Sequence, residues 1–185
     1  MINDFDKDMK IVGDFPSKNI AKNPDLYGDG ADYVREKASG NLDKAAKLGA
    51  ELATQFVKVC KKDELTISKD DSETLMTQKI LLLSFTVMAG LELFLPNMAL
   101  ANAARTTFFD SLFEIDKDLF EKSSDTGAFS FYYLSFRRGT DVDRRVGQTF
   151  AMLCSHDGDP IYQELGEALY CWFLSVVQKK VKEVM

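Results

Sequence analysis

The strongest constraint on the fold of this chain is an almost continuous apolar run over residues 80–95. The polar residues and glycines within the run are Ser84, Thr86, Gly90 and Glu92. Its sixteen residues fall short of the roughly 20 that a helix needs to cross a bilayer, and Pro96 then breaks the pattern. A helix without a polar face is stable in water only when other helices surround it. The run therefore predicts a central helix, over about residues 73–95, in a helical bundle.

Several other segments repeat apolar side chains every three or four residues, as amphipathic helices do. We expect these helices over about residues 41–62, 98–122, 142–155 and 161–183, with a helical turn or two over 32–39. The last helix has the clearest start, because Asp159 can cap it and Pro160 suits its first position. One face of the first long helix carries only small residues, which allows close approach by a neighbour: Ala45, Ala46, Gly49 and Ala53.

Length and composition fit a single domain. A chain of 185 residues lies in the usual size range of one domain, and 45% hydrophobic residues provide material for a sizeable core. Residues 1–30 are punctuated by Gly, Pro, Asp and Asn, which favour turns and irregular backbone. The sequence thus predicts an all-α fold: a single-domain helical bundle of five to six helices over residues 31–185, preceded by an irregular N-terminal arm over residues 1–30.

Residues 128–138 are ambiguous between helix and strand. Aromatic residues alternate with other residues in part of the segment, as in a strand, but they also form a helical stripe. With predicted helices on both sides and no second strand available for pairing, we expect a helix. Aromatic residues beside arginines are typical of interface cores, so the candidate interface residues are Tyr132, Tyr133 and Phe136. The alternative, that these rings fill the domain's own core, stays open.

Charge and cysteine content limit the classes of partner and compartment. The net charge of -6 argues against general nucleic-acid binding, which requires a surplus of Lys and Arg to displace counterions from phosphates. The three cysteines form no CxxC pair, which favours a reducing compartment and hence a cytoplasmic location. The first residues are acidic and lack the apolar segment of a secretory signal. We also expect no association with a membrane.

Catalytic and cofactor motifs are weak in this sequence. His156 is the single histidine, so a zinc site built from several histidines is impossible and any Ser–His or Cys–His arrangement must use it. His156 lies in a turn where a polar residue is expected in any case. Its neighbour Cys154 is the one candidate for a reactive thiol, with a small buried hydrophobe as the favoured alternative. Glycine-rich phosphate loops are absent, so we expect no cofactor, no metal ion and no catalytic residues.

Four arginines cluster within nine residues of an acidic chain: Arg137, Arg138, Arg144 and Arg145. Guanidinium groups match phosphate and carboxylate oxygens in a bidentate manner, so this cluster is a candidate anion-binding site. The alternative is local pairing with Asp141 and Asp143, because such ion pairs are common on helix surfaces.

Glu92 and Arg105 each stand alone among hydrophobic residues. If the chain reverses at Pro96, residue 92 faces about residue 101, and Arg105 lies one helical turn further, roughly 6 Å along the axis. One hypothesis is a buried ion pair that fixes the register of two helices. The other is a polar spot inside a ligand cavity of the bundle.

Because no catalytic arrangement is visible, the sequence favours a non-enzymatic protein-interaction or assembly module that forms a homo-oligomer or binds a protein partner. The alternative is a helical-bundle domain that binds a small anionic ligand, bearing phosphate or carboxylate, as a regulator or an enzyme. The features that favour the first function are the aromatic and small-residue helix faces. The feature that favours the second is the arginine cluster.

Overall fold

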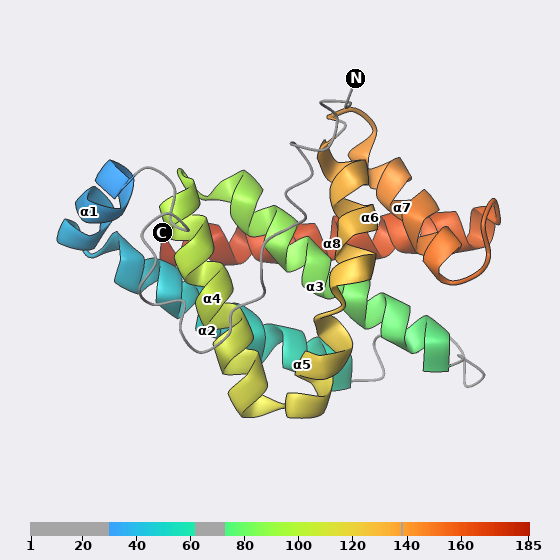
Figure 1. The fold of residues 1–185 in the computed structure, drawn as a ribbon, viewed down its shortest axis with the longest axis horizontal. Helices are drawn as coiled ribbons and strands as arrows, with labels where there is room; N and C mark the ends of the chain where they lie inside the picture. Colours follow the sequence, from blue (N-terminus) through green and yellow to red (C-terminus); the bar gives the residue numbers. More distant parts are fainter. Residues whose placement is uncertain (1–29, 62–72, 138) are drawn as a thin grey trace, which may run out of the picture.

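The computed structural model describes residues 30–61, 73–137 and 139–185, and within these ranges it contains eight α-helices and no β-strand (Figure 1). The helices are α1 (Gly30–Ala38), α2 (Asn41–Lys61), α3 (Glu73–Phe94), α4 (Met98–Ile115), α5 (Lys117–Ser123), α6 (Thr126–Arg137), α7 (Val142–Leu153) and α8 (Pro160–Val184). The predicted all-α class is confirmed, with more helices than the five to six expected. The predicted N-terminal arm lies outside the described residues, except for Gly30, which begins α1.

Helix α3 lies at the centre of the bundle, as its sequence predicted (Figure 1). It packs against α2, α4, α5, α6, α7 and α8, and every residue from Lys79 to Leu91 is buried. Among the described helices, α3 is the one long and apolar enough to cross a membrane, with a mean hydropathy of 1.4 in its most apolar window. However, 78% of that window is buried inside the domain. Packing against neighbouring helices therefore accounts for its hydrophobic sequence.

Helices α2 and α4 form the most extensive contact in the fold, and small side chains make it possible. A Cβ atom built on Gly49 of α2 would lie 2.2 Å from the carbonyl oxygen of Ala104 in α4, far inside van der Waals contact. The small face predicted for this helix is thus the face on which the two backbones meet. Gly147 has the same role between α7 and α8, where its Cβ would lie 2.4 Å from the carbonyl oxygen of Gln163.

The prediction of a single helix over residues 98–122 is wrong, because the helix is interrupted at Asp116. The extended backbone of Asp116 ends α4, and its carboxylate accepts a hydrogen bond from the Leu119 amide and so caps α5. The Lys61 ammonium of α2 lies 2.9 Å from the same carboxylate. The Leu119 hydrogen bond, followed by the interaction with Lys61, lowers the pKa of Asp116. The apolar stripe continues across the break, which is why periodicity alone did not reveal it.

The ambiguous segment is helical over residues 128–137, as expected, and residue 138 lies outside the described residues. It belongs to α6, which begins after Asp125. The Asp125 carboxylate accepts hydrogen bonds from the Gly127 and Ala128 amides at 2.8 and 3.2 Å. A short connection then leads into α7, and the Ser135 and Thr149 hydroxyls lie 2.7 Å apart between the two helices. The predicted start of α8 is confirmed as well, because Asp159 caps it and Pro160 is its first residue.

Substituting Gly49 by alanine tests the close contact between α2 and α4. Alanine favours a helix by about 1 kcal/mol over glycine, but here its methyl group overlaps backbone that cannot move without separating the helices. We expect Gly49→Ala to lower the free energy of unfolding by about 2 kcal/mol, measured by urea denaturation. Gly30→Ala is the matched control, because nothing lies within 4 Å of its Cβ position. Equal stability of the two variants would contradict this account of the helix contact.

Candidate functional site

The aromatic residues predicted to form an interface lie mainly in the domain's own core. Tyr132 has no exposed surface and stacks against Phe85 of α3, with ring centroids 5.1 Å apart. Tyr133 and Phe136 are half-buried and meet the same Phe85 ring edge-on. The interface assignment therefore needs correction at Tyr132, which no partner can reach. Periodicity showed that these rings share a helical stripe, but not that α3 covers it.

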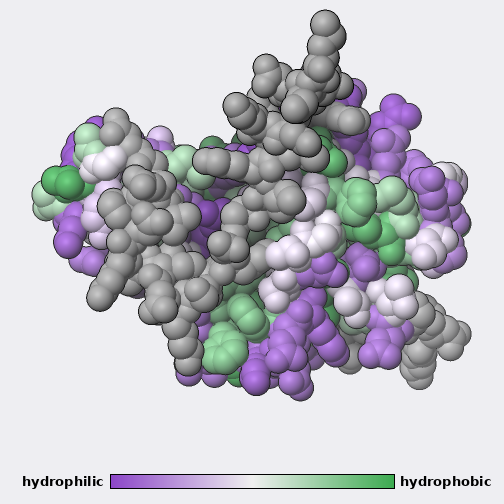
Figure 2. Space-filling model, in the orientation of Figure 1, coloured by the Kyte–Doolittle hydropathy of each residue, from purple (hydrophilic) through white to green (hydrophobic). Residues whose placement is uncertain are grey.

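The opposite side of α6 carries two of the exposed large hydrophobic residues of the described chain. Phe131 and Leu134, one helical turn apart, are 48% and 60% exposed. Met152 of α7 is 39% exposed. The Ser135 and Thr149 hydroxyls touch between α6 and α7, so positions 131 and 152 each lie about one helical turn from that contact. Figure 2 shows hydrophobic residues gathered over α6 and the adjoining part of α7. We call Phe131, Leu134 and Met152 the α6 face.

The arginine cluster does not converge on one described target. The Arg137 guanidinium lies 6.0 Å from the centre of the Tyr133 ring, a cation–π contact. Arg145 reaches the Thr140 hydroxyl at 3.5 Å, and the Arg144 side chain is exposed. Arg138 lies outside the described residues. The predicted local pairing is not seen either, since no ion pair among the described residues joins these arginines to Asp141 or Asp143.

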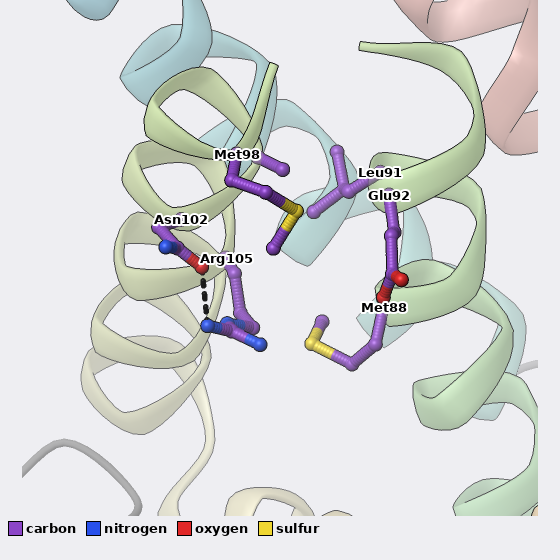
Figure 3. A pocket seen from close by; sticks show the side chains of 7 residues that line it. Met88, Leu91, Glu92, Met98, Asn102 and Arg105 are labelled. Atoms are coloured by element: carbon purple, nitrogen blue, oxygen red, sulfur yellow. Dashed lines mark hydrogen bonds between the residues drawn. The ribbon is translucent and has the colours of Figure 1, made fainter. Parts of the chain in front are cut away.

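Glu92 and Arg105 line one pocket between α3 and α4, but they do not form an ion pair with each other there (Figure 3). Arg105 instead donates a hydrogen bond to the side-chain oxygen of Asn102, one turn earlier in α4. Met88 and Met98 project into the space between the two charged groups (Figure 3). The structure therefore brings the two predicted residues to one pocket, but without the ion pair of the first hypothesis.

Tyr133 links this pocket to α6. Burial raises the pKa of its phenol, the Arg105 charge acts in the opposite direction, and the Glu92 charge raises it further. Both charged groups therefore lie close enough to Tyr133 to influence it, although they come from different helices.

Sequence reasoning missed two buried charged residues, Lys79 and Glu36. Lys79 of α3 has no exposed surface, and its position directly before the apolar run was the one signal that could have revealed it. Glu36 of α1 is 7% exposed and accepts hydrogen bonds from the Asn41 amide at 2.7 Å and the Asn97 amide at 2.9 Å. These bonds, led by that from Asn41, lower the pKa of Glu36 and attach α1 to the starts of α2 and α4.

The single histidine and the cysteines are not arranged for catalysis in the described part of the chain. The His156 ring is exposed and stacks on Tyr162, with ring centroids 3.8 Å apart. No hydrogen bond among the described residues joins it to Cys154, which is buried at the end of α7. Burial raises the pKa of the Cys154 thiol to about 11 and that of Cys60 to about 12. Within the described ranges, no three His, Cys, Asp or Glu residues gather as metal ligands.

Thiol labelling tests this description of the cysteines. The reactive species is the thiolate, so a thiol with a raised pKa reacts slowly at neutral pH, and burial slows it further. We expect a neutral alkylating reagent to modify Cys171 first, because it is exposed, and the half-buried Cys60 more slowly. We expect it to modify the buried Cys154 only after unfolding. Mass spectrometry of peptides from the labelled native protein measures the order, with urea-unfolded protein as the control. Fast labelling of Cys154 in the native protein would contradict its burial.

Comparisons with known proteins give no relative from which a function could be transferred. No protein-family model, no curated protein and no solved structure matches the chain. The α6 face and the pocket between α3 and α4 are therefore interpreted from their own geometry.

Proposed function

We propose that this chain is a non-enzymatic assembly module that forms a homodimer through the α6 face. The observation that carries the proposal is the pair Phe131 and Leu134, two large hydrophobic side chains about half exposed on adjacent turns of one helix. Their burial against a second copy removes apolar surface from water at about 25 cal/mol per Å². Polar and charged residues would otherwise be expected at such positions of a surface helix.

A second copy of the chain is a suitable partner because α6 is complementary to itself when paired in antiparallel orientation. A two-fold axis between residues 131 and 134 places Phe131 of one copy against Leu134 of the other. The same axis places Arg137, at the C-terminal end of α6, near Asp125 of the second copy. The two residues are then separated by about 5 Å along the direction of the helix axis. Opposite charges at the two ends then favour this orientation and disfavour the parallel one.

The size of the α6 face limits the strength of this dimer. A stable interface buries roughly 800 Å² on each partner, more than three partly exposed side chains provide. Neighbouring polar surface of α6 and α7 must therefore join the contact. We expect a reversible dimer whose population depends on protein concentration in the micromolar range.

The predicted alternative, binding of a small anion by the arginine cluster, has less support, because the described arginines contact different groups. A carboxylate-bearing ligand fits Arg105 better, since this guanidinium faces a pocket. That possibility does not depend on the dimer.

Light scattering on the wild type and on Leu134→Lys tests the proposed assembly. Because the two-fold axis brings residue 134 of each copy into the contact, two lysines there repel each other and lose the apolar burial. We expect the variant to be a monomer at concentrations where the wild type is a dimer. Val34→Lys is the matched control, since Val34 is 66% exposed on α1. Circular dichroism verifies that both variants are folded. A monomeric wild type, or equal dissociation by the control, would refute the proposal.

A further inference from the structure

We propose that the pocket between α3 and α4 binds a small zwitterion, a molecule with both an ammonium and a carboxylate group, of the size of a free α-amino acid. The ammonium binds Glu92 and the carboxylate binds Arg105. This site goes beyond the proposed assembly, and the residues that line it belong to α3 and α4 rather than to α6.

The first argument is that the charges of the pocket are not neutralised by each other. Glu92 and Arg105 are both half-buried. The partners of Arg105 are neutral, namely the Asn102 side chain and the Tyr133 phenol. Within the described ranges, no hydrogen bond or ion pair joins Glu92 to another side chain. A charge that is partly removed from water without a counter-charge is unfavourable. A ligand that brings one charge of each sign relieves both sites at once.

The second argument concerns the class of ligand. A simple anion is attracted by Arg105 but repelled by Glu92. A simple cation is attracted by Glu92 but repelled by Arg105. A zwitterion satisfies both groups and leaves no net charge in the pocket. The ammonium and the carboxylate of such a molecule can point toward different helices. Glu92 and Arg105 lie on facing helices, so each can bind one of the two groups (Figure 3).

The third argument concerns size and shape. The cavity is narrow: it measures about 10 Å³, room for about one water molecule, and it is lined by Met88, Leu91, Met98 and Ala101 besides the polar groups. A ligand therefore enters only when side chains of the wall move, and it must be small. Methionine side chains have several rotatable bonds, so Met88 and Met98 are the side chains that move aside for it.

Isothermal titration calorimetry with four probes tests the proposal: L-alanine, L-methionine, propionate and ethylamine. Propionate lacks the ammonium of alanine, and ethylamine lacks its carboxylate. We expect the two amino acids to bind with a Kd in the millimolar range or tighter, and each monofunctional probe to bind at least about tenfold more weakly. Absence of binding by both amino acids, or equal binding of propionate and alanine, would overturn the proposal.

Two substitutions assign the roles of the charged residues. We expect Glu92→Gln to remove the preference for alanine over propionate, because repulsion of the simple anion is lost. We expect Arg105→Gln to abolish binding of every carboxylate probe. Glu114→Gln and Arg144→Gln, at exposed positions, are the matched controls and should bind as the wild type does. Thermal unfolding without ligand verifies that each variant is folded.

The same variants also test whether Glu92 and Arg105 form a direct ion pair in the free protein. If Glu92 and Arg105 paired with each other in the free protein, the double variant would lower the Tm by clearly less than the sum of the single variants. Such coupling without ligand would overturn the proposal, whereas additive effects support it. Leu134→Lys should bind alanine like the wild type, so failure of the dimer and failure of the pocket are distinguishable.

Discussion

Burial of α3 on all its sides is the constraint on which the rest of the structure depends. From Lys79 to Leu91 no residue of this helix is exposed, so other helices must cover it completely. Each large apolar side chain that becomes fully buried contributes about 1.5–3 kcal/mol, so this helix contributes strongly to the hydrophobic stabilisation of the fold. Six helices pack against it, and their amphipathic sequences follow from having one side on α3 or its neighbours and the other in water.

Close helix packing adds a second layer of constraint. Gly49 and Gly147 allow neighbouring backbones to approach to distances that any side chain would prevent. Polar contacts then fix the ends of the elements: Glu36 binds Asn41 and Asn97, and Asp116 binds Lys61 and caps α5. The core determines which helices meet, and these contacts determine where each helix begins and ends.

At the two candidate sites, hydrophobic or charged side chains are left without full cover or neutralisation by the described domain. On the α6 face, Phe131 and Leu134 have no cover within the described domain, although the other side of α6 packs against Phe85. In the pocket, Glu92 and Arg105 meet between α3 and α4 without neutralising each other. Aromatic density drew attention to the first region in the sequence, and isolated charges drew attention to the second. It assigned the interface to the buried residue Tyr132, because a helical stripe does not show which side the core covers.

The sequence by itself determined the helical class, the central position of α3 and most helix locations, since hydrophobic spacing and capping residues act over a few neighbouring positions. It also indicated that small residues on α2 permit a close neighbour. Only the tertiary structure decided the break at Asp116, because the Lys61 contact there comes from a distant part of the chain. The same holds for the complete burial of Tyr132 and for the methionine walls between Glu92 and Arg105. These features depend on which helices meet and at which register, and that is set by packing over the whole domain rather than by local pattern.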